Sequence, residues 1–300
     1  MSEAASSVFA SLEAVLLDRH RLVETALREQ APQGDSAEVQ QAVAFSLFAT
    51  SKRFRPILAL LVAEVLGGDS RSVLPAACSI EMVHTASLIL DDLPCMDDAQ
   101  RRRGRPACHV VHGEANAVLA AFTLLNRAYE LLAQGWPGGP GAVLRHELAQ
   151  ELARAVGPSG MVAGQARDLA MTDKVLDFAT LEFIHSRKTG ALFIAAADLG
   201  ARATGAAPWA QRAVATYAKN LGLAFQIVDD LIDATGEKLE AGKDVGQDHK
   251  KTTFVSFAGV EGARQLAAEL IAASQEALQA FGEAAQPLRD LARYVVARRR

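Results

Sequence analysis

Residues 81–106 read EMVHTASLILDDLPCMDDAQRRRGRP, an apolar run followed by four aspartates and then four arginines. Apolar residues at three-and-four spacing predict a helix, and Pro94 is expected to end it just after the first acidic pair. Like charges at helical spacing destabilise a helix. We therefore expect these charges to face a ligand rather than each other. The aspartates are Asp91, Asp92, Asp97 and Asp98, and the arginines are Arg101, Arg102, Arg103 and Arg105.

The stretch FQIVDDLID at 225–233 forms a second acidic cluster, again at the end of an apolar run. Asp229 and Asp233 stand four residues apart on one helical face, while Asp230 is turned about 100° away. Unpaired carboxylates in such a place are costly, and a divalent cation with oxygen ligands relieves that cost. Neither cluster has the pattern of an EF-hand or a zinc site, so both indicate Mg²⁺. Acidic helix ends exposed to solvent are the alternative interpretation.

Basic residues accompany both acidic clusters. Carboxylate-bound Mg²⁺ beside Arg and Lys suits a diphosphate, whose negative charges need neutralising from more than one side. Taken singly, Arg53 and Lys250 are expected to be solvated surface residues, and His84 a buried core histidine. Gln165 and Asp168 are candidates for a polar support of the same cavity. The other basic residues that accompany the acidic clusters are Lys52, Arg55, Lys188, Lys243 and Lys251.

The composition favours helices, because half of the 300 residues are apolar and only 6% are aromatic. A net charge of −4 argues against a nucleic-acid partner. The three cysteines show neither an even count nor metal-ligand spacing, which favours a reducing, cytoplasmic setting. We find no signal-peptide pattern and no uncharged apolar run of the ~18 residues that span a bilayer, so no stable membrane insertion is expected.

Apolar periodicity predicts an all-α fold with about eleven helices. Several helices are apolar over most of their circumference, which is typical of the middle of a bundle and predicts a central apolar cavity. No Ser/Gly-rich or Pro-rich linker divides the chain, so a single domain over residues 1–300 is expected. The predicted helical ranges are 5–30, 36–50, 54–67, 72–93, 113–134, 141–156, 160–171, 177–204, 207–235, 252–281 and 286–297.

Five segments in this order resemble the trans-isoprenyl diphosphate synthases, most closely the bacterial geranylgeranyl diphosphate synthases of carotenoid pathways. They are EMVHTASLILDDLPCMDD with the following RRG, then KTGALF, LAFQIVDDLID, GKDVGQD and KTT. The resemblance covers about residues 45–260. It implies condensation of isopentenyl diphosphate with an allylic diphosphate, dependence on Mg²⁺ with three ions per active site, and a homodimer.

The resemblance also implies roles for particular residues. Metal ions on the allylic diphosphate would be held by Asp91, Asp97 and Asp229, with Asp92, Asp230 and Asp233 in support. The same diphosphate would be gripped by Arg102, Lys188, Lys243 and Lys251. Thr189 and Gln226 would face the developing carbocation. The isopentenyl diphosphate site would consist of Lys52, Arg55, His84 and Arg103.

Product length is expected to depend on the side chains one helical turn before Asp91, which are Ala86 and Ser87. Bulky aromatic residues at these positions stop growth at fifteen carbons in the family, so two small residues imply the C20 product, geranylgeranyl diphosphate. Farnesyl diphosphate synthase (C15) is the close alternative. A noncatalytic partner subunit is disfavoured because both aspartate clusters are intact. A terpene cyclase is disfavoured because it needs no isopentenyl diphosphate site.

Overall fold

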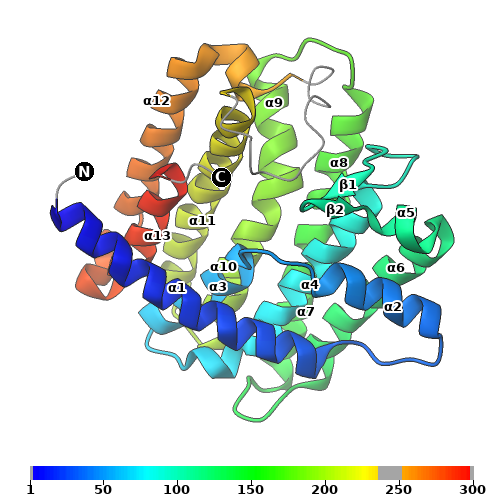
Figure 1. Ribbon diagram of the computed structural model, residues 1–300. Helices are drawn as coiled ribbons and strands as arrows, with labels where there is room; N and C mark the ends of the chain where they lie inside the picture. Colours follow the sequence, from blue (N-terminus) through cyan, green and yellow to red (C-terminus); the bar gives the residue numbers. More distant parts are fainter. Residues whose placement is uncertain (1–2, 236–251, 298–300) are drawn as a thin grey trace.

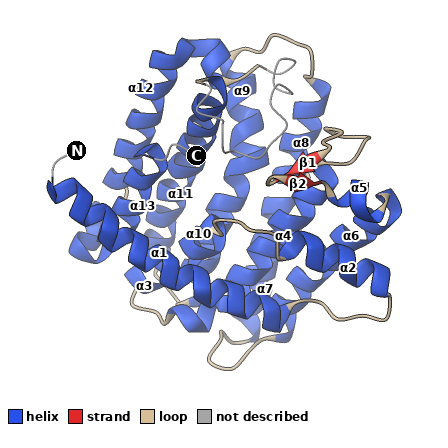
Figure 2. Cartoon of the chain, viewed as in Figure 1, coloured by secondary structure: helices blue, strands red, loops and turns tan. Residues whose placement is uncertain are grey.

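The computed structural model describes residues 3–235 and 252–297, and within them the chain is a bundle of helices (Figures 1 and 2). The N-terminal half comprises α1 (Glu3–Gln30), α2 (Ala37–Leu47), α3 (Phe54–Val65), η1 (Ser70–Val73), α4 (Leu74–Asp91), β1 (Arg101–Arg102), β2 (Arg105–Pro106), α5 (Cys108–His112) and α6 (Glu114–Gln134). The C-terminal half comprises α7 (Ala142–Val156), α8 (Met161–Ala170), α9 (Phe178–His185), η2 (Ser186–Gly190), α10 (Ala191–Ala203), α11 (Pro208–Ala234), α12 (Phe254–Glu276), η4 (Gln279–Ala285) and α13 (Gln286–Ala297).

The predicted all-α fold is confirmed. Eleven of the described helices have ten or more residues, and each of the eleven predicted ranges contains one of them. The range 177–204 is divided into α9, the π-helical turn η2 and α10. Helix α4 ends at Asp91, two residues before the predicted end at 93, with Asp92 as its C-terminal cap.

Two short elements were not predicted, namely α5 and the two-stranded hairpin of β1 and β2. The hairpin turns at Arg103 and Gly104, which have positive φ angles of 53° and 76°. Tight two-residue hairpin loops need positive φ at both central residues, a conformation that glycine adopts freely and arginine rarely. The turn therefore fixes Arg103 in an uncommon backbone conformation at the edge of the bundle.

Helices α3, α4, α10 and α11 supply most of the core, while α1 lies diagonally across the face seen in Figure 1. Helix α10 approaches α3 closely because Gly200 lacks a side chain, and a Cβ there would lie only 2.4 Å from the carbonyl oxygen of Ala59. Small residues at such crossings let helix backbones meet and leave little room for substitution.

The helical segment Ser70–Asp91 is long and apolar enough to cross a membrane by length and composition, with a mean hydropathy of 1.6. The segment is not an uncharged run, because it contains Arg71, Glu81 and Asp91, so it does not contradict the sequence-based expectation. In its most apolar window of 18 residues, 72% is buried inside the bundle. It has the environment of a core helix, and its apolar character serves packing.

Candidate active site

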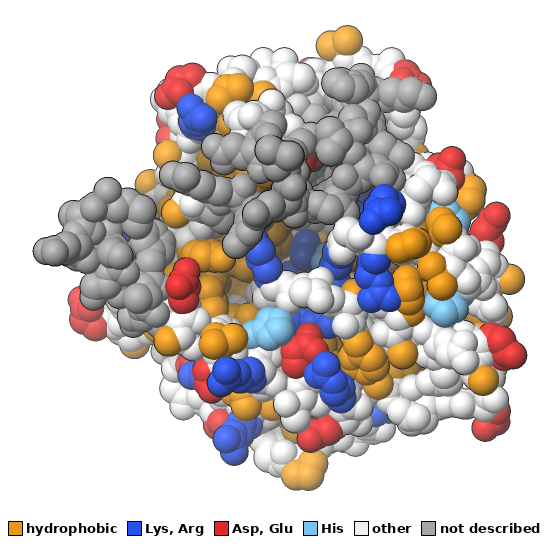
Figure 3. Space-filling model, in the orientation of Figure 1, with side chains coloured by type: hydrophobic (Ala, Val, Ile, Leu, Met, Phe, Trp, Pro, Cys, Tyr) orange, Lys and Arg blue, Asp and Glu red, His pale blue; other side chains and the backbone are white. Residues whose placement is uncertain are grey.

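A cavity of about 560 Å³ opens where the C-terminal ends of α4 and α11 meet at one end of the bundle. Figure 3 shows Lys and Arg side chains gathered around this hollow. The two acidic clusters therefore lie at one site although they are more than a hundred residues apart in the sequence. The predicted residues that line the cavity are Lys52, Arg53, Arg55, His84, Ser87, Asp91, Asp97, Arg102, Arg103, Asp168, Lys188, Thr189, Gln226, Asp229, Asp230 and Asp233, whereas Gln165 does not line it. Lys243, Lys250 and Lys251 lie outside the described residues.

The first aspartate cluster folds back on the end of α4. The amide of Asp97 donates to the carbonyl oxygen of Asp91 at 2.9 Å, and the amide of Ala99 donates to that of Asp92 at 3.2 Å. This loop is possible because Pro94 cannot continue the helix. The six-residue spacing thus brings the side chains of Asp91 and Asp97 to the same ammonium group, that of Lys188.

The Lys188 ammonium lies among three carboxylates. Its Nζ is 2.9 Å from Asp168 Oδ2, 3.8 Å from Asp91 Oδ2 and 3.9 Å from Asp97 Oδ2. Asp168, expected only as a polar support, is therefore the carboxylate nearest to Lys188. A basic group that converges with several carboxylates marks a position where positive charge is stabilised.

Lys188 and Thr189 lie in η2, a π-helical turn between α9 and α10. Single π-helical turns inside α-helices occur frequently at functional sites. The turn is pressed against α8 at Gly164, where an added Cβ would lie 2.2 Å from the backbone nitrogen of Lys188. The absence of a side chain at Gly164 is therefore what allows Lys188 to reach Asp168 on α8.

The donor set at this wall fits Mg²⁺. Burial raises the pKa of Asp91, Lys188 lowers it and Asp97 raises it again, so the carboxylate is short of compensating positive charge. Asp oxygens are the ligands that Mg²⁺ prefers. Within residues 3–235 and 252–297, no three acidic, His or Cys side chains converge closely enough to hold a metal unaided. Asp91, Asp97 and Asp229 would therefore hold Mg²⁺ together with phosphate oxygens of a substrate.

Asp92 has a different place from its neighbour Asp91, because it is buried and does not line the main cavity. Both of its carboxylate oxygens accept from Arg102, whose Nε lies 2.9 Å from Oδ1, and Nη2 of the same guanidinium makes a further short contact. Burial opposes the charge of Arg102, yet its hydrogen bonds to Asp92 raise the pKa of the guanidinium. Asp92 thus holds Arg102 in the cavity wall, and this geometry gives it a supporting position.

Arg55 and Arg103 also line the cavity, and no carboxylate of the described residues forms an ion pair with either of them. Burial lowers the pKa of Arg55 to about 10, and burial also lowers that of Arg103. Arg55 lies over the Phe193 ring, 4.7 Å from its centroid, and its Nη1 is 3.2 Å from His84 Nε2. Arginines that are desolvated without compensation favour an anionic ligand, which would restore the balance of charge.

His84 is neutral and accepts from Arg55. Burial lowers its pKa well below the ordinary value, and the positive charges of Arg55 and Arg103 lower it further. A neutral imidazole has one ring nitrogen free to accept, and the 3.2 Å contact from Arg55 uses Nε2 in that way. The interpretation of His84 as only a core histidine is therefore too narrow, because its ring lines the cavity.

Arg53 corrects one expectation. Instead of being a solvated surface residue, its side chain is fully buried and forms ion pairs with Glu24 and Glu81. The residue lies between Lys52 and the start of α3 and has a φ angle of 48°. Sequence reasoning also missed Glu81. It could have been identified as an acidic residue in the apolar middle of a predicted helix.

All three aspartates of the second acidic cluster line the cavity, but Asp230 is the buried one. Asp230 Oδ1 accepts from Gln226 Nε2 at 3.0 Å, and its Oδ2 accepts from the amide of Phe254 at the start of α12 at 2.9 Å. Thr189 Oγ1 in turn donates to Gln226 Oε1 at 3.1 Å. Asp230 therefore orients the Gln226 amide with its oxygen toward Thr189.

The two positions expected to set product length have different environments. Ser87 lines the cavity, and its hydroxyl donates to the carbonyl oxygen of His84 at 2.8 Å. Ala86 is fully buried in the core and is not among the lining residues. Apolar side chains also line the cavity, including Leu88, Leu192 and Phe225.

Comparison with known proteins identifies the family to which this site belongs. The family description Polyprenyl synthetase matches residues 36–288. The chain belongs to the polyprenyl synthetase family. Geranylgeranyl diphosphate synthase from Cyanophora paradoxa is 40% identical over 286 residues, covering 94% of this chain and 95% of that protein. Geranylgeranyl pyrophosphate synthase 9, chloroplastic, from Arabidopsis thaliana is 43% identical, covering 92% of this chain and 78% of that protein.

Solved structures of this family have the same fold. An FPP/GFPP synthase from Zymomonas mobilis superposes with a TM-score of 0.83 at 34% identity, covering 97% of this chain and 99% of that chain. A geranyltransferase from Legionella pneumophila superposes with a TM-score of 0.85 at 28% identity, covering 99% of both chains. The protein is thus a trans-isoprenyl diphosphate synthase, a prenyltransferase that acts on isoprenoid diphosphates, and the enzyme class expected from the sequence is confirmed.

Proposed function

We propose that this polyprenyl synthetase condenses isopentenyl diphosphate head to tail with allylic diphosphates, that it requires Mg²⁺, and that its main product is geranylgeranyl diphosphate (C20). The observation that carries the proposal is that one cavity holds two unlike charged groups together with apolar side chains. One group comprises carboxylates and Lys188, which suit a metal-bound diphosphate. The other comprises Arg55 and Arg103, which suit a diphosphate bound without metal.

The residues would divide the reaction as follows. Mg²⁺, when bound, supplies positive charge to the departing diphosphate. Lys188 and Arg102 add their charges from the protein side, which stabilises the transition state in a preorganised site. Thr189 and Gln226 present oxygen dipoles to the electron-poor allylic carbon chain. Arg55 anchors isopentenyl diphosphate so that its double bond attacks that chain, and the proton lost passes to the released diphosphate.

The apolar part of the wall excludes water from the reacting atoms. An allylic cation is quenched by water, so its lifetime depends on a dry surface around it. Leu88, Leu192 and Phe225 line the same cavity as the charged residues and provide such a surface. The same surface would accommodate the growing chain.

The C20 product is favoured by the small side chains at 86 and 87 and by the names of the relatives, several of which are geranylgeranyl diphosphate synthases. A second candidate is farnesyl diphosphate synthase (C15). It is favoured by the structural neighbour described as an FPP/GFPP synthase. Both candidates share the reaction and differ only in where growth stops.

Product analysis tests the proposal. Purified protein is incubated with Mg²⁺, labelled isopentenyl diphosphate and, separately, the C5, C10 and C15 allylic diphosphates, and the dephosphorylated alcohols are separated. A C20 alcohol that disappears with a chelator is expected. Accumulation of a C15 alcohol establishes the second candidate. Elongation that persists in the chelator contradicts the Mg²⁺ requirement, and absence of elongation from every starter contradicts the function.

We infer further that two copies of the chain pair through α5 and α6. Four large apolar side chains there are between 48% and 66% exposed, namely Val110, Val111, Leu119 and Phe122. Leu119 and Phe122 are three residues apart on one helical face, a spacing suited to helix–helix contact. Light scattering should give a dimer that Phe122→Asp converts to monomer. Val143→Asp on α7, another exposed apolar position, is the matched control and should leave the dimer intact.

We also propose that residues 1–300 act as one domain in the cytoplasm. The family match spans 36–288, and α1 packs against α3, α4 and α13, which joins both ends of the chain to the same core. All three cysteines, Cys78, Cys95 and Cys108, are free thiols, which fits a reducing compartment.

A further inference from the structure

Arg53 lies at the edge of the cavity but is almost completely buried, and among the described residues it is the cation with the most hydrogen-bond partners. Its Nη1 donates to Glu81 Oε1 at 2.6 Å, and its Nε donates to Glu24 Oε1 at 2.7 Å. Its Nη2 donates to the carbonyl oxygens of Leu47 and Ala49 at 2.5 and 3.4 Å. The side chain thereby connects α1, the end of α2 and the middle of α4.

The position of Arg53 in the chain links these contacts to the proposed isopentenyl diphosphate site. Lys52 precedes it directly, and Arg55 follows two residues later at the start of α3. The positive φ of Arg53 is an uncommon backbone conformation that persists only where surrounding contacts fix it. The buried guanidinium supplies those contacts, and so it determines where the segment carrying Lys52 enters the cavity.

Glu81 presents a problem for any anion that binds here. The carboxylate belongs to the cavity lining, and it interacts electrostatically with Arg55 and Arg103 as well as with Arg53. A negative charge inside an anion site opposes the ligand, and more strongly where water is excluded. The ion pair with Arg53 cancels that charge from behind.

We propose that Arg53 is a positioning residue of the isopentenyl diphosphate site: it neutralises Glu81 and fixes the segment that carries Lys52 and Arg55. The site then keeps an uncompensated positive charge for the incoming diphosphate. This inference rests on the proposed function, because it assumes that isopentenyl diphosphate binds at Arg55.

The two partners of the ion pair should behave differently when each is removed. Arg53→Met leaves Glu81 facing the diphosphate, and the KM for isopentenyl diphosphate should rise about tenfold, equivalent to ~1.4 kcal/mol. Glu81→Gln removes the opposing charge, and that KM should stay within about twofold of wild type or fall, because Arg53 keeps Glu24 as a partner. In the double variant, the KM should lie clearly below that of Arg53→Met, because the opposing charge is gone although Arg53 no longer fixes the segment. The KM for the allylic diphosphate should change little in all three.

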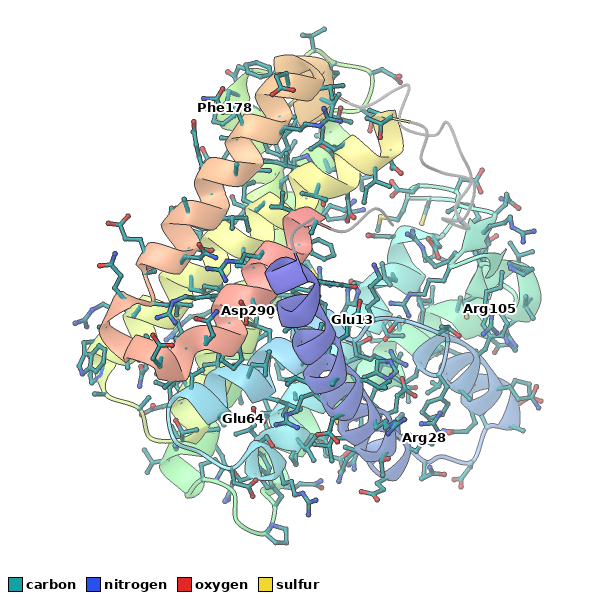
Figure 4. The ribbon with its side chains drawn as sticks, turned by 60° about the vertical axis from the view of Figure 1, so that its left-hand side comes forward. Glu13, Arg28, Glu64, Arg105, Phe178 and Asp290 are labelled. Atoms are coloured by element: carbon teal, nitrogen blue, oxygen red, sulfur yellow. The ribbon has the colours of Figure 1, made fainter. Side chains whose placement is uncertain are left out.

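A purely structural ion pair predicts another pattern, in which either single variant weakens binding equally and the double variant gives no recovery. The matched control is the pair of Arg19 and Glu64, which joins α1 to α3 with an Nε–Oε1 distance of 2.6 Å. Figure 4 labels Glu64 on α3 beside α1. Arg19→Met should lower thermal stability without changing the KM for isopentenyl diphosphate.

The outcomes separate this inference from the function on which it rests. If wild-type protein condenses no substrate, the proposed function fails first. If wild type condenses but Arg53→Met leaves the KM unchanged, or Glu81→Gln raises it as much as Arg53→Met, the positioning role is overturned. If Arg53→Met does not fold, Glu81→Gln alone tests the positioning role. A KM for isopentenyl diphosphate several times higher than that of wild type contradicts the proposal, and an unchanged or lower KM supports it.

Discussion

Replacing Gly164 by alanine should greatly reduce turnover without unfolding the protein. The added Cβ would lie 2.2 Å from the backbone nitrogen of Lys188, and ordinary contact begins near 3.4 Å, so η2 or α8 must move by about 1.2 Å. This shift displaces Lys188 from Asp168, to which its Nζ is now bonded at 2.9 Å. A displacement of ~1 Å near reacting groups can lower the rate about a hundredfold, so kcat should fall by about that factor.

Helix propensity predicts the opposite result, because Gly→Ala in a helix interior otherwise stabilises by roughly 1 kcal/mol. The assay is steady-state condensation with labelled isopentenyl diphosphate, accompanied by thermal unfolding. Gly262→Ala is the matched control, since its Cβ would meet only the Ala258 side chain of the same helix at 3.1 Å. A Gly164→Ala enzyme with wild-type kcat and a higher melting temperature would refute the close contact as the reason for glycine there.

Four further substitutions test other parts of the site. Asp230→Asn should release the Gln226 amide and lower kcat about tenfold, while the Mg²⁺ concentration for half-maximal activity stays the same. Asp229→Asn, by contrast, should raise that Mg²⁺ concentration. His84→Gln should flatten the pH dependence of the free energy of unfolding. Because folding lowers the pKa of His84, the unfolded chain takes up the proton first as the pH falls, and wild type loses stability below about pH 6.5. The variant should lose less stability over the same pH range. Ala86→Phe should shorten the main product from C20 to C15, read by chromatography of the alcohols, and an unchanged product would place the end of the cavity elsewhere.

Sequence patterns predicted the helices well because apolar periodicity and burial are two aspects of the same packing. The range 72–93 contains α4, and Pro94 ends it where proline must. The predicted range 177–204 could not show η2, because a π-helical turn changes hydrogen bonding without changing the apolar pattern. The hairpin at 101–106 escaped for a similar reason, since its strands are only two residues long.

The same patterns identified the charged residues of the site but not which of them bind one another. Arg53 and Arg55 are two residues apart in a basic segment, and nothing in their order shows that Arg53 forms buried ion pairs while Arg55 contacts His84 and Phe193. That difference arises from the left-handed backbone at Arg53 and from an acidic residue on another helix. Adjacent aspartates differ likewise, because Asp92 faces Arg102 while Asp91 faces Lys188.

The π-helical turn η2 also couples the fold to the chemistry. A turn closed by i→i+5 bonds contains one residue more than an α-helical turn, so everything after it is rotated by about 100° relative to a continuous helix. Deleting one residue between 186 and 190 would restore regular helix, but it would also swing α10 so that its apolar face no longer met α3. A variant with that deletion would therefore lose the packing of α10 on α3. The extra residue in the turn that presents Lys188 also sets the rotation of the helix that follows it.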